Sequence, residues 1–420
     1  MRTLIFLVAV CSAYAESRFP FTMAQRAQAV AVLDMSSPGS DWAVKGSEAA
    51  IVDVSLDGKP HQQVVLFAGP ARHAYRLSLG LLTPGEHEIT VERNDRFSAP
   101  QAQFEAHELK IEEMGAAHPE HDVYAYAPVL HARLNTIGKF SDIPLVLYCE
   151  RVKDTTGDTL QYTVIFSNED GGTSTRTLMS RWGRTTDIEY VYRRSVATGQ
   201  GIVQGPGHKD VEFTGQHDGS HPLLMPVTDN NMVAEAKDSP LRFRPAPVLV
   251  DLSVVSREDV MDRHPFTYVV MGKELLREGK LRPFGVAAGE KISDPRNYLF
   301  VDYSATLSDA SMTVSVRTKD GRLHSSDFGR SDVAIDRSGH VRTTVELPPK
   351  TSREDIDEIA FQCRVAQPAR GETVAHSGQC VLHGVAKVFQ LRSDYTPLPR
   401  FWWMTQPVTM RTGAGMAYRP

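Results

Sequence analysis

Two carboxylates in one predicted strand are the residues of this chain best suited to chemistry. In "RTTDIEYVYR", Asp187 and Glu189 alternate with the large apolar residues Ile188, Tyr190 and Tyr192. Residues two apart in a strand project from one face about 7 Å apart at Cα, so the two carboxylates should lie together. Such a pair can act as general acid and base, or hold a divalent cation as a cofactor, while the apolar residues anchor the strand in the core. The alternative is a solvated strand face with interspersed charges, which is common in antiparallel sheets.

A histidine-containing turn follows in "GQHDGSHPLL". His217 and His221 flank Asp218, and Gly219 permits a tight bend between them. Two imidazoles with a carboxylate can transfer protons or bind a metal ion. The zincin pattern H-E-x-x-H requires a helix, which Gly219 and Pro222 disfavour here, so a loop is expected. The alternative is that both histidines are ordinary structural or exposed loop residues.

Two further polar segments are predicted to border the same cleft. Asn230 and Asn231 follow an apolar run, where a loop at the mouth of a pocket is expected. The segment "KISDPRNYLF" places Asp294, Arg296 and Asn297 before a strand, and its Asp-Pro-Arg-Asn sequence is a turn signal. Arg296 could clamp a carboxylate, a sulfate or a sugar hydroxyl. We therefore expect both segments to supply ligand-binding groups.

Together these segments predict an acidic cleft, and whether it is catalytic stays open. The residues expected to act in catalysis are Asp187, Glu189 and His217. The residues expected to contact a ligand are Arg184, His221, Asn230, Asn231, Asp294, Arg296 and Asn297. The ligands expected for a divalent cation are Asp187, Glu189, His217 and Asp218.

The strand with the two carboxylates also resembles part of a known family. The secreted necrosis- and ethylene-inducing-like proteins carry a G-H-R-H-D-W-E heptapeptide on a central β-sandwich, where it binds a divalent cation beside a sphingolipid-sugar site. The stretch "GRTTDIEY" is similar in its D-x-E and its preceding Gly, and "HPLLMPVT" is similar to the His-Pro strand that follows. The resemblance extends at most from Tyr124 to Val233 and implies that Asp187 and Glu189 occupy the cation-site positions. Neither histidine of the heptapeptide is present, and Ile188 replaces its Trp.

The strand pattern around these residues predicts a mainly β protein with two β domains. Short alternating strands with Gly, Pro and Asn turns in residues 25–115 predict an immunoglobulin-like sandwich. Residues 120–400 predict a larger antiparallel β-sandwich domain that carries the site. Within it, "SREDVMDRHPFTYVVMGKELLREGK" predicts a short insertion of one or two helices. The aromatic and Gly/Pro-rich tail, residues 401–420, is expected to pack along this domain without forming an element of its own.

Residues 1–15 have the pattern of a secretory signal peptide, because one Arg precedes an apolar run that ends in the small-residue site A-Y-A. The run is too short to cross a bilayer, and no later stretch approaches the roughly 20 apolar residues of a transmembrane span. We therefore expect a secreted or periplasmic protein.

Composition and motifs exclude several function classes. Of the 420 residues, 41% are hydrophobic and 23% charged, as in ordinary folded proteins. The net charge is -5 and the basic residues are spread along the chain, which argues against a nucleic-acid partner. No phosphate-binding G-x-x-x-x-G-K-[ST] loop, dinucleotide motif or G-x-S-x-G nucleophile elbow is present.

The cysteines indicate one disulfide. Cys11 would leave with the signal peptide, while Cys363 and Cys380 flank a loop between two apolar strands. In an oxidising compartment a hairpin-closing bridge is expected there, with a stabilisation of about 3 kcal/mol. Cys149 lies in "IPLVLYCE" and is expected to be a buried free thiol, with a catalytic cysteine as the alternative.

Three functions remain compatible with these patterns. The first is a secreted carbohydrate-active or glycan-binding protein, with the acidic cleft as its site. The second, implied by the resemblance, is a cation-dependent protein that binds a glycolipid. The third is a non-catalytic envelope or matrix protein in which the charged strand is solvated.

Overall fold

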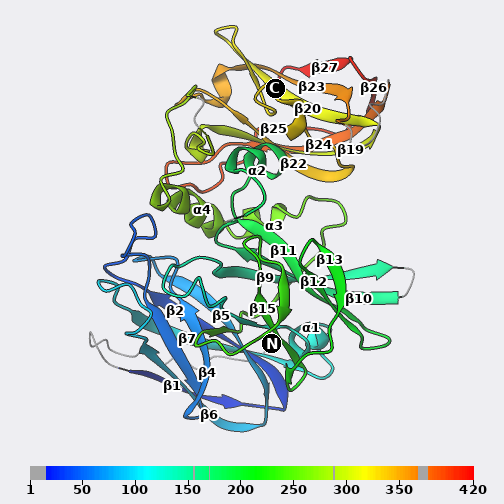
Figure 1. Ribbon diagram of the computed structural model, residues 1–420. Helices are drawn as coiled ribbons and strands as arrows, with labels where there is room; N and C mark the ends of the chain where they lie inside the picture. The colour runs from blue at the N-terminus through cyan, green and yellow to red at the C-terminus, as the bar shows by residue number, and fades with distance from the viewer. Residues whose placement is uncertain (1–15, 155–156, 170, 287–288, 368–376) are drawn as a thin grey trace. The chain divides into compact units, whose positions relative to one another are not determined.

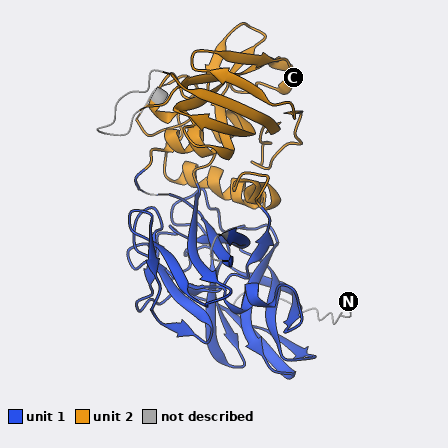
Figure 2. Cartoon of the chain, turned by 90° about the vertical axis from the view of Figure 1, so that its right-hand side faces the viewer, with its two compact units in different colours: residues 1–172, 186–251 blue, residues 173–185, 252–420 orange. Residues whose placement is uncertain are grey.

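The computed structural model describes residues 16–154, 157–169, 171–286, 289–367 and 377–420. The predicted signal peptide therefore lies outside the described residues. The chain forms two compact units (Figure 2), one of Met1–Gly172 with Thr186–Asp251 and one of Thr173–Thr185 with Leu252–Pro420. The predicted mainly β class is confirmed, with 48% strand and 10% helix.

The first unit begins with the predicted immunoglobulin-like sandwich (blue and cyan in Figure 1). One sheet has the order β1 (Ser17–Met23), β6 (Gly85–Arg93), β3 (Ile51–Leu56), β4 (Lys59–Val65). The other has the order β5 (His73–Leu82), β2 (Ala27–Ser36), β7 (Glu105–Gly115). All pairs are antiparallel, and apolar side chains such as Val30, Leu33 and Ile89 are fully buried in the core.

A second β region completes this unit. Its larger sheet has the order β13 (Lys209–Glu212), β12 (Gly201–Gly205), β11 (Asp187–Ser195), β10 (Gly157–Phe166), β9 (Pro144–Asp154), β18 (Val248–Val250). The smaller sheet contains β14 (His217–Asp218), β15 (His221–Pro226), β8 (Val129–His131) and β17 (Arg242–Phe243), with β16 (Val233–Glu235) on β15 and the helix α1 (His121–Ala125) nearby in sequence. Two pairs, β18 with β9 and β15 with β8, are parallel. This region is therefore mixed, whereas the sequence predicted purely antiparallel pairing.

The strand that carries the two carboxylates contains a bulge. Tyr162 of β10 pairs with Tyr192, but the next residue of β10 pairs with Tyr190, so Val191 is an extra residue in β11. A bulge interrupts the alternation of faces. Ile188 and Tyr192 are therefore buried as predicted, whereas Tyr190 is only half-buried and Val191 takes its expected place in the core.

The second unit is a sandwich of two antiparallel sheets. One has the order β22 (Gly339–Glu346), β19 (Tyr298–Ser308), β24 (Gln379–Phe389), β25 (Trp402–Met404), with β26 (Val408–Arg411) also on β24. The other has the order β21 (Leu323–Ser325), β20 (Ala310–Thr318), β23 (Ile356–Val365), β27 (Gly415–Tyr418). The predicted tail therefore supplies three strands, and the expectation that it forms no element was wrong. Strands this short contain too few alternating residues to be recognised without their partners.

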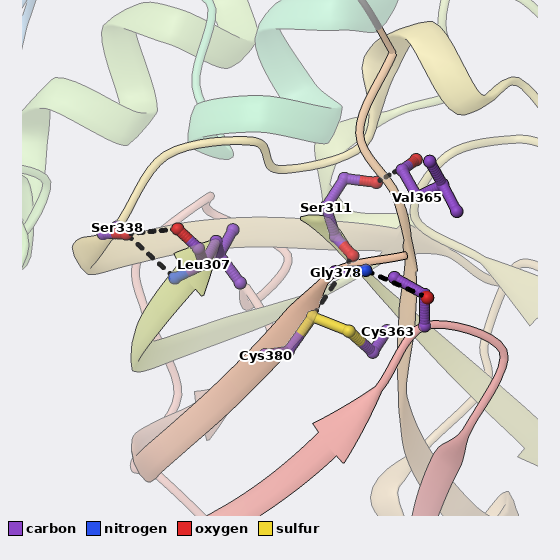
Figure 3. The surroundings of a disulfide bond; sticks show 8 residues. Leu307, Ser311, Ser338, Cys363, Val365, Gly378 and Cys380 are labelled. Atoms are coloured by element: carbon purple, nitrogen blue, oxygen red, sulfur yellow. Dashed lines mark hydrogen bonds between the residues drawn. A yellow bond between two sulfur atoms is a disulfide. The ribbon is translucent and has the colours of Figure 1, made fainter. Parts of the chain in front are cut away.

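The disulfide between Cys363 and Cys380 is present, with a Cα–Cα distance of 5.8 Å (Figure 3). Cys363 belongs to β23 and Cys380 to β24, which are strands of different sheets. The bridge therefore joins the two sheets through the buried core. The prediction that it closes a hairpin within one sheet was wrong. Cys149 is a buried free cysteine, and burial raises the pKa of its thiol.

Helices cover part of the second unit. α3 (Asp259–Arg263) and α4 (Phe266–Arg277) confirm the predicted helical insertion. A helix that was not predicted, α2 (Thr175–Trp182), begins after Ser174, whose hydroxyl accepts a hydrogen bond from the backbone N–H of Thr177, and ends at Gly183 with φ +65°. The short 3-10 helices are η1 (Pro295–Asn297), η2 (Ser331–Val333) and η3 (Arg353–Asp355). None of the helices in the described part of the chain is long and apolar enough to cross a membrane.

A buried ion network attaches α3 and α4 to the adjacent sheet. Arg342 of β22 is fully buried and donates two hydrogen bonds to Asp302 of β19, with N–O distances of 2.5 and 2.7 Å. The same guanidinium donates to Asp262 of α3 at 2.8 Å and to the hydroxyl of Tyr268 in α4. Lys387 of β24 contacts Asp262 as well and lies 3.6 Å from Asp302.

Candidate functional site

The two predicted carboxylates lie in different surroundings within the first unit. Asp187 is buried, with 1% of its surface exposed, and its Oδ2 accepts a hydrogen bond from Nδ2 of Asn231 at 3.0 Å. Asn231 is itself buried, with φ +54°, and also donates to the carbonyl of Asn168. The loop residue expected at a pocket mouth therefore does meet the strand carboxylate, but as part of a buried polar pair.

Glu189 is more accessible, with 13% of its side chain exposed, and lies 4.0 Å from Nδ1 of His208. The ring of His208 also contacts the side chains of Gln204, at 2.9 Å, and Asn230, at 3.4 Å. His208 is not among the site residues predicted from the sequence. It stands alone in a Gly-rich turn between two short strands, and only the pairing of β12 with β13 brings it over Glu189.

The histidine turn lies at the other end of β15. His217 is exposed, Asp218 accepts a hydrogen bond from Arg244 at 3.1 Å, and His221 is buried with its Nδ1 2.8 Å from the carbonyl of Ala127. β15 runs from His221 to Pro226 before the asparagine loop begins. At about 3.3 Å per residue, this strand separates the two groups by about 17 Å.

The polar residues of the first unit thus form two separate groups. Among the residues that the structure describes, no three His, Cys, Asp or Glu side chains are grouped closely enough to hold a metal ion. The remaining predicted residues, Arg184, Asp294, Arg296 and Asn297, belong to the second unit. Arg184 is buried there, and its Nε lies 3.4 Å from Oε1 of Glu258.

A cleft of about 480 Å³ lies at one end of the sandwich in the second unit. Strand register explains its position: Tyr298 pairs with Glu346, Phe300 pairs with Phe389, and Val388 pairs with Trp402. The segments that enter or leave the four strands of this sheet therefore meet at one edge. The residues that line the cleft are Arg296, 350–354, Gln390, Leu391 and 398–401.

Arg296 is the predicted ligand-binding residue that lines this cleft, and its guanidinium is held in place. It donates to both carboxylate oxygens of Asp294, at 2.8 and 2.6 Å, and to the carbonyl of Ser393 at 3.0 Å. It also stacks on the ring of Tyr395 at 4.6 Å, while the hydroxyl of Tyr395 donates to Asp294. Burial raises the pKa of Asp294, but the hydrogen bonds and charge of Arg296 outweigh burial and keep the pKa below its usual value.

Tyr395 in turn rests on α4. It is buried and has φ +70°, and its ring lies against Gly272, where an added Cβ would be 2.4 Å from the ring. A glycine inside a helix costs about 1 kcal/mol relative to alanine. At position 272 this cost is offset because only glycine leaves room for the ring of Tyr395. The helical insertion therefore supports the cleft residue Arg296 through one aromatic side chain.

Four cationic side chains and one carboxylate line the cleft. Besides Arg296 these are Lys350, Arg353 and Arg400, and the carboxylate of Glu354 accepts a hydrogen bond from Arg353 at 2.8 Å. The cleft is thus basic, whereas the sequence predicted an acidic cleft in which Arg296 would lie beside Asp187 and Glu189. The basic residues lie in three separate segments of the chain, so no local pattern marks them as one site.

The same cleft contains fixed hydrogen-bonding and apolar groups. The buried amide of Gln390 donates to the carbonyl of Thr351 at 2.8 Å and holds the two neighbouring segments together. Phe401 is half-buried at the edge of the cleft. Beyond it, the guanidinium of Arg400 stacks at 4.8 Å on Trp403, whose surface is 55% exposed.

Comparisons with known proteins do not assign this chain to a family. No family model and no curated protein matches it. Two solved structures of a lectin from Pleurotus ostreatus align with it, one in complex with GalNAc and one in the apo form, each at 10% sequence identity. The alignments cover 96% and 93% of this chain and 78% and 82% of the lectin chains, with a TM-score of 0.14 in both cases. TM-scores this low do not establish a common fold.

Proposed function

We propose that this protein binds a carbohydrate in the basic cleft of the second unit. The observation that carries the proposal is a cleft of about 480 Å³ in which the polar side chains of Arg296 and Gln390 are held in place before any ligand arrives. That volume falls within the roughly 300–1,000 Å³ of small-molecule sites. Arg296 and Gln390 are fixed by their own hydrogen bonds, so binding loses less side-chain entropy at these residues.

The mixture of groups suits a sugar. A sugar ring presents hydroxyls around its edge and C–H groups on its faces. The lining offers hydroxyls on Thr351 and Ser352 and an amide on Gln390, beside the apolar surfaces of Leu398 and Phe401. Polar groups can therefore meet the ring edge while an apolar side chain covers a face.

Binding without hydrolysis fits this lining better than catalysis. Glycosidases of the common type use two carboxyl groups on either side of the scissile bond. The described lining contains one, Glu354, which is exposed and paired with Arg353. A catalytic role for Asp187 and Glu189, and a cation-dependent glycolipid site there, stay predictions.

We further propose that the protein works outside the cytoplasm. The disulfide between Cys363 and Cys380 supports this, because disulfides persist in oxidising compartments. Pulse-labelled protein should be shortened near Ala15 and appear outside the cytoplasm. Unprocessed protein that stays in the cytosol would contradict the proposed export.

The cleft can be tested by filling it. Leu398 is 39% exposed and lines the cleft, so Leu398→Trp should block the site without removing a polar contact. Leu323 is 54% exposed on β21 and outside the lining, so Leu323→Trp is the matched control. The test is to find a ligand on a glycan array and measure its affinity for each variant. Leu398→Trp should lose binding and Leu323→Trp should keep it, while equal binding by both variants would exclude this cleft.

A further inference from the structure

The charges of the cleft point to a more specific ligand, and this inference rests on the proposed carbohydrate site. We infer that the cleft binds an acidic saccharide, one that carries sulfate or carboxylate groups. Sulfate and carboxylate share the chemistry that the site would recognise: a compact anion whose oxygens accept several hydrogen bonds. The cations of the lining that have no carboxylate partner within the protein are the ones available to such an anion.

Two of the four cations have carboxylate partners within the protein. Arg296 is paired with Asp294 at 2.6 Å, and Arg353 is paired with Glu354 at 2.8 Å. Lys350 and Arg400 are exposed, and neither forms an ion pair with any carboxylate in the described part of the chain. The cleft therefore presents two uncompensated positive charges.

The backbone conformation of Lys350 supports a functional role for its positive charge. Lys350 has φ +68°, a left-handed conformation that glycine or asparagine adopts with less strain. A lysine in this conformation is disfavoured relative to glycine because its Cβ crowds the backbone. The turn alone therefore does not account for a lysine here, whereas a charge required at the cleft does.

The guanidinium of Arg400 is positioned so that its edge can bind an anion. Its guanidinium stacks on the exposed ring of Trp403 at 4.8 Å, and one nitrogen donates to the carbonyl of Ala386. Stacking fixes the plane of the guanidinium, so its remaining N–H groups can form a fork toward sulfate or carboxylate oxygens. The exposed indole of Trp403 can also cover the face of an adjoining sugar.

The charge of the whole chain favours a short acidic saccharide over an extended polyanion. The formal net charge is -5, so the basic cleft is a local feature on a protein with an excess of acidic residues. A long polyanion such as nucleic acid would meet repulsion outside the cleft, whereas a saccharide of a few units would not.

The test uses the full-length chain and three oligosaccharides of equal length: neutral, uronate-containing and sulfated. Affinities are measured by calorimetry at low and high salt for the wild type and for Lys350→Gln/Arg400→Gln. The control variant is Lys319→Gln/Arg411→Gln, which removes the same charge from exposed positions of the same unit outside the lining.

We expect at least one acidic probe to bind more tightly than the neutral one, and added salt to weaken its binding. The cleft variant should lose about tenfold or more in affinity for that probe, since charge-assisted hydrogen bonds are the strong ones. The control variant should bind as the wild type does. The preferred acidic probe, uronate or sulfated, identifies the anion.

Equal binding of neutral and acidic probes, unaffected by salt and by the cleft substitutions, would overturn the acidic ligand and leave the proposed carbohydrate site intact. Failure of every saccharide to bind would overturn both. If the double variant does not fold, Arg400→Gln and the salt dependence decide the question. Arg400 is exposed, and within the described residues its side chain makes one hydrogen bond, to the carbonyl of Ala386.

Discussion

Replacing Arg342 with methionine should strongly destabilise the second unit. The guanidinium is fully buried and binds two carboxylates, Asp262 and Asp302, together with the hydroxyl of Tyr268. Methionine retains most of the apolar volume, so the cost comes chiefly from the uncompensated charge of Asp302. Its remaining cationic neighbour is Lys387 at 3.6 Å. Removing one partner of a buried ion pair typically costs about 3–5 kcal/mol, and we expect Arg342→Met to fall in that range at neutral pH.

The loss should depend on pH in a defined direction. Burial raises the pKa of Asp302 above the usual value of an aspartate despite the opposing charge of Arg342, and removing Arg342 must raise the pKa further. The folded variant then binds a proton more tightly than the unfolded chain does. The loss of unfolding free energy relative to the wild type should therefore be smallest below about pH 4, near the pKa of an aspartate in the unfolded chain. It should grow as the pH rises through the pKa of Asp302 in the folded variant.

The assay is denaturant unfolding followed by tryptophan fluorescence over a range of pH. Three of the four tryptophans, Trp182, Trp402 and Trp403, belong to the second unit, so the signal reports mainly on it. Arg411→Met, an exposed substitution on β26, is the control and should change the unfolding free energy by no more than about 0.5 kcal/mol. A loss below about 1 kcal/mol for Arg342→Met, or a loss that is constant with pH, would refute the reasoning.

Three further predictions concern stability and the cleft. Replacing Cys363 and Cys380 by serine should destabilise the second unit by about 3 kcal/mol in denaturant unfolding, since the bridge closes a loop of 17 residues' separation; an unchanged midpoint would contradict this. Gly272→Ala should cost about 1–3 kcal/mol and weaken glycan binding, because the new methyl group displaces Tyr395, on which the guanidinium of Arg296 stacks; a gain in stability would contradict it. Asp187→Asn should lower the unfolding free energy by about 1–3 kcal/mol, and Glu189→Gln by less than about 0.5 kcal/mol, because only the first carboxylate is fully buried. Equal effects would count against that difference in burial.

Features with a local signal were predictable from the amino-acid sequence. The helices α3 and α4 follow from an acidic start and from a break at Pro265. The immunoglobulin-like sandwich follows from alternating strands with turn residues between them, and the disulfide follows from two cysteines that flank one loop. In each case the information lies within a few neighbouring residues.

Features that depend on strand pairing were not predictable in the same way. The sequence indicated a strand at Asp187, but the bulge that moves Tyr190 out of the core arises only from its pairing with β10. The sequence likewise identified both cysteines, whereas their positions on different sheets follow from the order of strands in the sandwich. Periodicity within one strand contains no information about its partner.

The candidate site shows the same division. The residue types alone marked Arg296 as a group that could clamp an anion or a sugar, and its turn was recognisable from the Asp-Pro-Arg-Asn sequence. Only the tertiary structure decided that Lys350 and Arg400 are its neighbours. Their segments meet because β19 pairs with both β22 and β24, which brings the ends of distant strands to one edge of the sheet. The chemistry of each side chain is local to the sequence, whereas a cleft is a property of backbone pairing between segments far apart in the chain.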